Sequence, residues 1–514
     1  CADNQNTIGS LRRPPSAYVR DDRELYMQHS YWHTGEACGQ LGLLRDGSEL
    51  VPRIAETGTI QLVKDFLPCP VIALKDGRTE KHLFSELRIK EASSDCNLVE
   101  YRFSNPRCEA ASATRIWAFR PAEGGDIVAL VESSIAPSPE AKSKELDISA
   151  RVLSVAMMPP LPPQWRYTFM NGDGSLASGQ FSELAKGVFR RNVNAPGGAA
   201  MIWPNDAGSV VFIPLDGKPC ELAFSNDSSW KGRERLGVFK HDVKISASEP
   251  LKSSYLVALR GGSAVAAQED LLKLKKLYSD LGSCVKNIDK GSLLSSGYPL
   301  ELDADNGMAS FTLKPLDRKD PLPIRLKGVN ERWETAVCVN GKLRTVGAFD
   351  GVLNCVADLT PGEESKVQVG NLIASDEKSL AIEYAGPAFG GARIHVFNPL
   401  EKSVSAQIWS VFPASCIAPF KVNVQLKPGA GVWLWTRGEL AVKEDAFSQV
   451  SNCEALPDGA LKLEIRGGEF AFFGDQLHVS ANGKELGAAS NGELTSIEGL
   501  ASIQSLTLTN RAKK

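Results

Sequence analysis

The segment His29–Glu36 carries the densest group of chemically reactive side chains in this sequence. It reads His-Ser-Tyr-Trp-His-Thr-Gly-Glu and holds two of the six histidines, two aromatic rings and a carboxylate. His29 and His33 are four residues apart, so either a helix or a strand would place both imidazoles on one face. An imidazole that titrates near neutrality can serve as a general acid or base, and a tyrosine can donate a proton. We therefore predict catalytic roles for His29, Tyr31 and His33.

Trp32 and Glu36 complete this segment as candidate substrate-binding residues. An indole can stack on the apolar face of a sugar ring, and a carboxylate lies close by. The two histidines and Glu36 could also hold a metal ion. However, His-x3-His without the adjacent glutamate of His-Glu-x-x-His is not specific for one, so we predict no metal site. In the structural alternative, Tyr31 and Trp32 pack into a sheet and both histidines form ordinary hydrogen bonds.

A second group, far along the chain, combines aromatic, amide, acidic and basic side chains. Aromatic rings beside such groups suit carbohydrate, which offers apolar ring faces and a rim of hydroxyls. An arginine could neutralise a uronate while a base removes the adjacent proton, as in a lyase. A hydrolase would need two carboxyl groups, for which Asp206, Glu234 and Asp242 are the local options. We predict catalysis by His241, or a solvated charge cluster on hairpins as the alternative. The candidate substrate-binding residues are Trp203, Asn205, Asp206, Arg233 and Arg235.

The composition is that of a folded protein with more than one hydrophobic core. At 514 residues the chain is long enough for about three or four domains. The apolar fraction of 43% and the charged fraction of 23% argue against long disordered regions. A formal charge of -3 gives no global field that would attract nucleic acid. No apolar run reaches the roughly 18 residues of a membrane span. We expect neither a nucleic-acid partner nor a membrane-spanning segment.

Cys1 resembles the lipid-carrying cysteine at the start of a mature bacterial lipoprotein. The sequence begins without Met, and residues 1–24 contain a polar, Asn-rich stretch and two consecutive prolines, which would form a tether. We therefore expect an exported protein of the bacterial outer surface or periplasm, whose only membrane contact is a lipid on Cys1. The alternative is that Cys1 marks an arbitrary start of the sequence.

The cysteines beyond Cys1 number ten, which permits disulfides in an oxidising compartment. Cys96 with Cys108, and Cys338 with Cys355, flank expected hairpins and are the preferred pairs. Free buried thiols are the alternative. No Cys-x-x-Cys or paired Cys/His spacing supports structural zinc.

Strand signals dominate the chain. Short runs rich in Val, Ile, Phe and Tyr alternate with polar residues, and turn pairs such as Asn340-Gly341 separate them. The sequence therefore predicts an all-β fold of mostly antiparallel sheets. The clearest strands are Asn97–Phe103, Asp126–Ser133, Ser209–Leu215, Lys366–Leu372, Arg393–Asn398 and Gly431–Thr436.

One segment interrupts the strands with helical spacing. From Ala264 to Leu281 apolar residues recur every three or four positions, and Gly282 is a suitable C-cap. We place the domain boundaries around this connecting helix. The predicted units are a tether over 1–24, a large β-sandwich with the candidate active site over 25–262, the helix and a linker over 263–296, small β-sandwiches over 297–377 and 378–442, and a C-terminal β module over 443–514.

Two tryptophans and three isolated histidines remain outside these groups. Trp433 and Trp435 are two residues apart, so a strand would direct both to one side, as a sugar-binding platform or as part of a sheet core. His82, His395 and His478 have no reactive neighbours in the sequence, and we interpret them as structural.

The hairpin that follows the first cluster supports a family comparison. His29–Pro52 leads from aromatic residues into Gly39-Gln-Leu-Gly-Leu-Leu-Arg-Asp-Gly-Ser-Glu-Leu50, a glycine-led strand, a charged turn and a Glu-Leu return. This pattern resembles the opening hairpin of galactose-mutarotase-like β-supersandwich domains, over roughly residues 25–262. Such domains occur in sugar epimerases and in several polysaccharide lyases and glycoside hydrolases, often followed by smaller β-sandwiches. The resemblance implies a carbohydrate ligand.

Three functions remain open at this point. The chain lacks a phosphate-binding glycine loop, a GxGxxG before a helix and a GxSxG elbow, so we expect no nucleotide chemistry and no cofactor. The first hypothesis is an exported enzyme, a polysaccharide lyase or glycoside hydrolase, acting on a polysaccharide or oligosaccharide in a His/Tyr/Arg cleft of the N-terminal domain. The second is a non-catalytic, glycan-binding surface lipoprotein. The third is a structural β protein of an extracellular assembly. The sequence leaves the oligomeric state undetermined.

Overall fold

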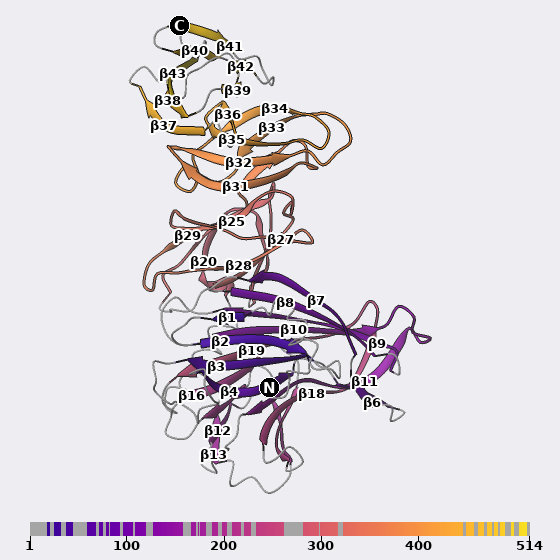
Figure 1. Cartoon of the computed structure of the whole chain (residues 1–514). Helices are drawn as coiled ribbons and strands as arrows, with labels where there is room; N and C mark the ends of the chain where they lie inside the picture. Colours follow the sequence, from indigo (N-terminus) through magenta and orange to yellow (C-terminus); the bar gives the residue numbers. More distant parts are fainter. Residues whose placement is uncertain are drawn as a thin grey trace.

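Four β-rich units follow one another along the molecule, from the N-terminal unit to the C-terminal one (Figure 1). This computed structural model describes the backbone of the strands given below and a subset of the side chains. Side chains are described continuously over most of 281–456, with gaps at 298, 317–321 and 446–448. Elsewhere they are described over 72–75, 100, 102, 108–117, 129–150, 152, 166–170, 173, 175–180, 198, 211–216, 220–222, 240–257, 461–466 and 480.

The N-terminal unit is built from two large antiparallel sheets. Sheet A contains, in spatial order, β1 (Tyr18–Arg20), β2 (Leu25–Tyr31), β3 (Ala37–Leu44), β4 (Thr59–Leu67), β11 (Glu145–Met157), β18 (Arg233–Ser246), β17 (Cys220–Asp227) and β14 (Val188–Val193), with β5 (Val71–Leu74) and β6 (Thr79–Lys81) beside β11. Sheet B contains β13 (Leu176–Gln180), β12 (Arg166–Met170), β15 (Gly198–Ile202), β16 (Gly208–Pro214), β19 (Leu251–Gly261), β10 (Ile127–Pro137), β9 (Ala110–Phe119), β8 (Cys96–Asn105) and β7 (Leu83–Ala92).

Sheet B buries side chains on both of its faces, which explains its long apolar strands. On one face, Phe212 and Tyr255 pack with ring centroids 5.3 Å apart, and the Tyr255 hydroxyl donates to the Val152 carbonyl of sheet A at 3.4 Å. On the other face, Trp117 and Leu130 are fully buried and belong to the core of the second unit. Side chains alternate between the faces of a strand, so β9 and β10 contribute to two cores at once.

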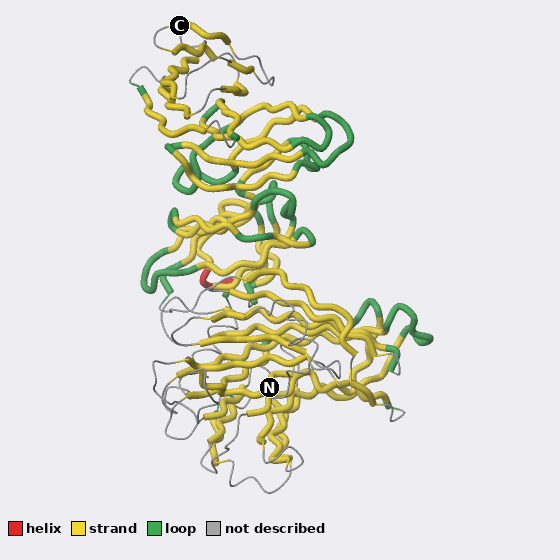
Figure 2. The backbone as a smooth tube through the Cα atoms, in the orientation of Figure 1, coloured by secondary structure: helices red, strands yellow, loops and turns green. Residues whose placement is uncertain are grey.

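The second unit is a sandwich of two smaller sheets. Sheet C contains β20 (Val285–Lys290), β23 (Met308–Leu313), β29 (Ser365–Asn371), β25 (Thr335–Val339) and β26 (Lys342–Thr345). Sheet D contains β21 (Ser292–Ser295), β22 (Leu300–Asp303), β24 (Leu322–Lys327), β28 (Val352–Ala357) and β27 (Ala348–Phe349), with β22 and β24 parallel. The 3-10 turn η5 (Gly282–Cys284) leads into β20 and is the one helical element among the residues that the structure describes (Figure 2).

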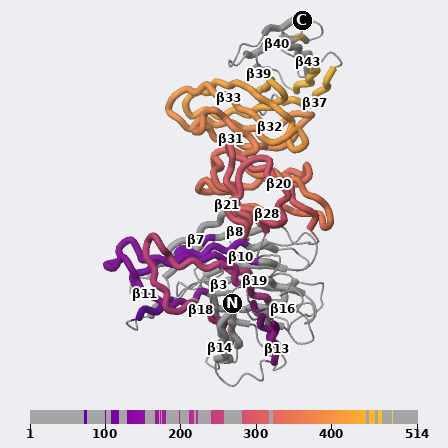
Figure 3. Tube along the Cα trace, turned by 180° about the vertical axis from the view of Figure 1, so that it is seen from behind, coloured from indigo at the N-terminus to yellow at the C-terminus, as the bar shows by residue number. Residues whose placement is uncertain are grey.

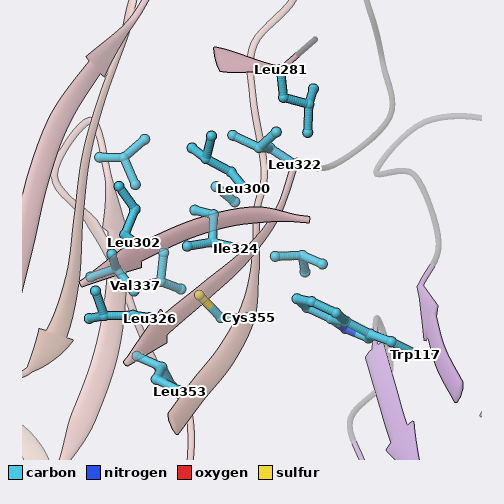
Figure 4. Packing of buried hydrophobic residues seen from close by; sticks show 14 of the residues in the cluster. Trp117, Leu281, Leu300, Leu302, Leu322, Ile324, Leu326, Val337, Leu353 and Cys355 are labelled. Carbon is cyan, nitrogen blue, oxygen red and sulfur yellow. The ribbon is translucent and has the colours of Figure 1, made fainter. Parts of the chain in front are cut away.

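The first two units share a hydrophobic core. Figure 4 shows Trp117 of sheet B facing Ile324 and Cys355 of sheet D, with Leu281 and Leu300 in the same cluster. Burying an aromatic side chain of this size stabilises a fold by roughly 2–3 kcal/mol. This shared packing joins the second unit to the outer face of sheet B. The first and second units are therefore packed against each other through one hydrophobic core.

The third unit is also a two-layer sandwich. Sheet F contains β30 (Ile373–Ser375), β33 (Val404–Ser410) and β34 (Lys421–Leu426); sheet E contains β31 (Ala381–Ala388), β32 (Gly391–Phe397), β35 (Gly431–Arg437), β36 (Leu440–Glu444), β39 (Phe470–Gly474) and β42 (Thr495–Ile497). Ile408 of sheet F and Leu434 of sheet E are both fully buried in the cluster between the layers. Side chains alternate along a strand, so the residues directly before and after Ile408 and Leu434 lie on the outward faces of the two sheets.

The C-terminal unit adds a fifth small sheet and completes sheet E. Sheet H contains β37 (Gln449–Ala455), β38 (Leu461–Arg466), β43 (Ile503–Asn510), β40 (Leu477–Ala481) and β41 (Lys484–Ala488). Figure 3 shows the same succession of units from behind. Because β39 and β42 pair into sheet E, the third and C-terminal units share a sheet and are not divided at residue 442.

The predicted fold class is confirmed, and the predicted domain boundaries stay predictions, although observed strands lie inside the predicted tether and linker. The chain is all-β, and each of the six clearest predicted strands coincides with an observed strand within a few residues. The tether over 1–24 includes β1, which pairs with β2. The predicted linker over 286–296 contains β20 and β21, and β30 of the third unit's sheet lies before residue 378. The predicted helix over 264–281 falls almost entirely in 262–280, outside the described residues.

The cysteine pairing differs from the prediction. Cys338 of β25 forms a disulfide with Cys416, which lies in the loop between β33 and β34. Cys355 and Cys108 are buried and take part in no disulfide, so neither predicted pair forms. The hairpin argument failed because it considered only near neighbours in sequence, whereas this bridge spans 78 residues and joins two units.

Candidate functional site

The predicted reactive segment begins on β2, at one side of sheet A. The backbones of His29 and Tyr31 belong to this strand, which pairs with β1 and β3. Trp32, His33 and Glu36 lie outside the described residues, and the side chains of His29 and Tyr31 are not among those described. Their catalytic and binding roles therefore stay predictions.

The second predicted group is distributed over two sheets. Arg233 and Arg235 begin β18 of sheet A, and only their backbone is described. Trp203, Asn205 and Asp206 fall between β15 and β16 of sheet B, outside the described residues.

The strand register restricts how these residues could meet. His29 pairs with Gly39, Gly39 with Phe66, Phe66 with Val155, and Val155 with Leu236. His29 is therefore level with the residue next to Arg235, but β3, β4 and β11 lie between them. At about 4.8 Å per strand, their backbones are about 19 Å apart across the sheet. The two positions suit contacts to separate rings of an extended ligand better than contacts to one reacting atom.

His241 is the one predicted catalytic side chain that the structure describes. It is exposed, and its Nε2 lies 3.3 Å from Oε1 of Glu221 on the neighbouring strand. The next residue, Asp242, has a positive φ of 51°, and its N–H donates to the Ser149 hydroxyl at 3.2 Å, where β11 and β18 lose regular register. His241 is six residues from Arg235, or about 20 Å along the strand.

The described residues hold a different candidate site, a groove on the outward face of sheet F. We call it the Trp409 groove. It is a shallow, open cavity of about 510 Å³. Three segments line it: Gln407, Trp409 and Ser410 of β33; Pro419 and Phe420 just before β34 with Lys421, its first residue; and Gly438 and Glu439 after β35. An indole, an amide, an ammonium and a carboxylate thus converge from three strand ends.

The strands position these groups through side-chain and backbone hydrogen bonds. Gln407 Nε2 donates to Asn423 Oδ1 at 3.1 Å across β33 and β34. The Gln407 N–H donates to Asp376 Oδ1 at 2.8 Å, which holds β33 against the end of β30. On the other side, the Lys421 N–H donates to the Gly438 carbonyl at 2.7 Å and ties β34 to the turn that follows β35. The groove floor is therefore fixed before a ligand arrives.

Alternation along β33 explains why Trp409 is available. Ala406 and Ile408 are buried in the core, so Gln407 and Trp409 lie on the opposite, outward face. Trp409 is partly exposed, although indole rings are among the largest apolar groups that a core could use. In the sequence, Gln407 and Trp409 are two residues apart in a strand pattern, which would have indicated an outward-facing tryptophan. From the sequence we selected Trp433 and Trp435 instead.

Trp435 does not form a platform with Trp433. Trp435 is fully buried, and its Nε1 donates to the Ala388 carbonyl at 2.8 Å. Trp433 is 44% exposed and stacks on His395. The two tryptophans share a face, but the hairpin between β31 and β32 covers one of them. His395, interpreted from the sequence as an isolated structural residue, has this aromatic neighbour and an acidic one, Glu383.

The described residues contain neither a cluster of metal ligands nor a helix that could span a membrane. Among the described residues, no three His, Cys, Asp or Glu side chains gather closely enough to hold a metal ion. Within the same part of the chain, no helix is long and apolar enough to cross a membrane. The Asp303–Gly307 segment, which resembles a calcium loop, forms a tight turn with positive φ at Asn306 and Gly307.

Comparison with known proteins finds partial matches to solved structures, at low sequence identity and low TM-score. No protein-family model matches the chain, and no curated protein matches it. Among solved structures, the galactosidase domain of an alpha-galactosidase-sucrose kinase, AgaSK, is 10% identical over 50% of this chain and 42% of that one, with a TM-score of 0.36. The GH36 alpha-galactosidase AgaA from Geobacillus stearothermophilus is 11% identical over 48% and 40%, with a TM-score of 0.33.

A third similar structure is smaller. A putative aldose 1-epimerase from Escherichia coli K12 is 12% identical over 46% of this chain and 99% of that one, with a TM-score of 0.28. The present chain thus spans about two fifths of each galactosidase that it matches, but nearly the whole epimerase.

Proposed function

We propose that this chain is an exported carbohydrate-active protein that binds a polysaccharide or oligosaccharide through its third unit. The observation that carries the proposal is the Trp409 groove, in which a partly exposed indole lies between amide, ammonium and carboxylate groups on a preformed sheet surface. An indole stacks on the apolar face of a pyranose, and the polar groups can pair with its hydroxyls.

The disulfide supports the exported part of this proposal. Disulfides persist in oxidising compartments and are rare in the cytosol. Cys338 and Cys416 join two units at a point that includes a partly exposed residue, Cys416.

We propose that catalysis belongs to the N-terminal unit. Sheet A contains β2, which carries His29 and Tyr31, and β18, which carries Arg233 and Arg235. His29 is level with the start of β18 and about 19 Å from it. Such a spacing fits an extended glycan lying across the sheet. We propose a polysaccharide lyase or glycoside hydrolase on this basis, with a non-catalytic glycan-binding lipoprotein as the alternative.

One experiment tests binding and chemistry together. The protein is incubated with acidic and neutral polysaccharides while affinity, absorbance from unsaturated uronate and new reducing ends are followed. We expect Trp409→Ala to weaken binding up to about tenfold, because aromatic stacking contributes roughly 0.5–1.5 kcal/mol. Gln425→Ala, which changes an exposed residue farther along β34, is the control.

The outcomes separate the hypotheses. A lyase gives both chemical signals, a hydrolase gives reducing ends only, and binding without either signal indicates the non-catalytic protein. If Trp409→Ala binds every glycan as tightly as the unaltered chain does, the groove is not the binding site.

A further inference from the structure

The outward face of sheet E carries an exposed aromatic surface that the Trp409 groove does not include. We call it the Trp433 platform and define it by Trp433, His395 and Phe397. Trp433 is 44% exposed and Phe397 36% exposed. The rings of Trp433 and His395 stack with their centroids 4.6 Å apart and their planes at 25°. Because the two residues pair directly across β35 and β32, the strand register holds the indole in place.

Gly431 keeps this platform open. It pairs with Phe397 in the register, two residues before Trp433. A Cβ atom at this position would lie 2.8 Å from His395 Nε2 and 3.5 Å from Phe397 Cδ2. The backbone there does not require glycine, since its φ is not positive. The missing side chain therefore serves to leave the edges of both rings accessible.

The charges beside the platform define which glycans it suits. Glu383 on β31 is 69% exposed and lies 3.5 Å from His395 Nδ1. Glu444 on β36 is buried and is held by Arg393 through two hydrogen bonds of 2.8 and 3.1 Å. The exposed charge next to the rings is thus a carboxylate, which repels uronate and sulfate groups but can accept hydrogen bonds from sugar hydroxyls.

The platform and the groove face opposite directions. Leu434, next to Trp433, and Ile408, next to Trp409, are both buried between sheets E and F. Packed sheets lie about 10 Å apart, so the two indoles project away from each other on either side of the sandwich. A single stretch of glycan cannot contact both surfaces without wrapping around the unit.

We propose that the Trp433 platform is a second carbohydrate-binding site, specific for neutral oligosaccharide, and that the third unit thereby bridges two glycan chains. Stacking on Trp433, with Phe397 beside it, binds pyranose rings through their C–H faces, while Glu383 accepts hydroxyl protons. The bridging part rests on the proposed function of the Trp409 groove. Two sites on one rigid unit would raise the avidity for a network of polysaccharide molecules, although neither site gains a new contact.

The test is calorimetric titration of the full chain with neutral hexasaccharides, together with pelleting of the matching polysaccharide. We expect two sites per chain. Trp433→Ala should weaken one site up to about tenfold and Trp409→Ala the other, and each should reduce cross-linking of polysaccharide into pellets. A hexamer of galacturonate should not bind at the platform.

Two further variants keep the result interpretable. Gly431→Ala should weaken the same site as Trp433→Ala by closing the gap between His395 and Phe397, without removing an aromatic ring. Phe349→Ala, which truncates a 40% exposed aromatic residue of the second unit, should change neither site.

Each other outcome counts against a distinct claim. If Trp409→Ala alone weakens binding and Trp433→Ala has no effect, the platform is not a site, while the groove stands. If Trp433→Ala alone weakens binding, bridging fails together with the groove. If neither variant changes binding, both proposals are wrong.

Discussion

Arg325 connects the first two units through a largely buried charge network. Its side chain is 7% exposed and contacts Glu132 of β10 through Nη1 and Nη2, at 3.0 and 2.5 Å. Its remaining donors reach Glu301 at 2.8 Å and Asn354 at 3.0 Å within the second unit. The guanidinium fork makes four hydrogen bonds to two carboxylates and an amide, one more than the three donors of a lysine could make.

Removing this cation should destabilise the molecule strongly. In Arg325→Met, the carboxylate of Glu132 stays partly buried, with Arg115, 3.9 Å away, and Lys327 as the cations that still act on it. Loss of one partner of a buried pair costs about 3–5 kcal/mol, so we expect a clear drop in the midpoint of urea unfolding.

Lys327→Met is the matched control for this change. Lys327 is 48% exposed and lies 3.5 Å from Glu301, and such surface pairs contribute about 0–1 kcal/mol. Similar midpoints for the two variants would show that Arg325 contributes no more than a surface charge.

For single residues, the sequence predicted the direction or chemical role of a side chain better than it predicted the residues that the side chain contacts. The alternation around Trp433 correctly predicted a side chain directed to one face of a strand, but it could not show that a hairpin covers Trp435. Cys338 was correctly expected in a disulfide, but its partner lies in another unit. Periodicity is local information, whereas both outcomes depend on contacts between distant segments.

The loop between β33 and β34 is the element that joins the disulfide to the Trp409 groove. Trp409 and Ser410 lie at one end of this loop, and Phe420 and Lys421 at the other. Cys416 lies within it, and its N–H and that of Ile417 both donate to the Pro413 carbonyl, at 2.8 and 3.2 Å. The bridge to Cys338 therefore anchors both ends of the groove to the second unit.

Breaking the bridge should loosen the groove without unfolding the sheet. In Cys416→Ala we expect faster amide hydrogen exchange over residues 411–420 and severalfold weaker glycan binding, because the loop ends lose a covalent anchor. Cys284→Ala, at a partly exposed free thiol, should leave both measurements unchanged. Unaltered exchange in the loop of Cys416→Ala would mean that the strands alone hold it.

The strands and turns could largely be predicted, because strand periodicity and turn preference depend on residues that are close together in the sequence. Asn340-Gly341, predicted as a turn, adopts φ of 49° and 82° between β25 and β26, as a two-residue hairpin turn requires. The shared sheet E could not be predicted, because β39 and β42 join it from beyond a separate sheet, H. The sequence left helix and strand open for the first reactive cluster; the backbones of His29 and Tyr31 belong to β2, and the partners of these residues remain predictions.

For the whole molecule, the two central junctions differ in how they depend on ionisation. At the first, burial opposes ionisation of Glu132, but Arg325 outweighs it and holds the pKa of this carboxyl below its usual 4.5. At the second, burial raises the pKa of Glu334, although the Tyr384 N–H donates to its carboxylate at 3.0 Å. Glu334 precedes β25 and its backbone pairs with Ile382 of the third unit.

These opposite shifts determine what acid should do. A lowered carboxyl pKa gives stability that is present above the unfolded value and is lost as pH falls through the folded one. A raised carboxyl pKa has the reverse effect, so protonation of Glu334 does not weaken its junction. The second junction also has the disulfide between Cys338 and Cys416, which does not titrate.

We therefore expect acidification from pH 6 to about pH 3.5 to loosen the molecule between its first and second units and not between its second and third. Hydrogen exchange, corrected for intrinsic rates, should rise in β10 and β24 but stay low in β25 and β31. In Glu132→Gln the first junction should be weaker at pH 6 and should no longer respond to acid, because the titrating group is absent. Equal loss of protection at both junctions would contradict the assignment, since it would place the acid-sensitive group outside the Glu132 network.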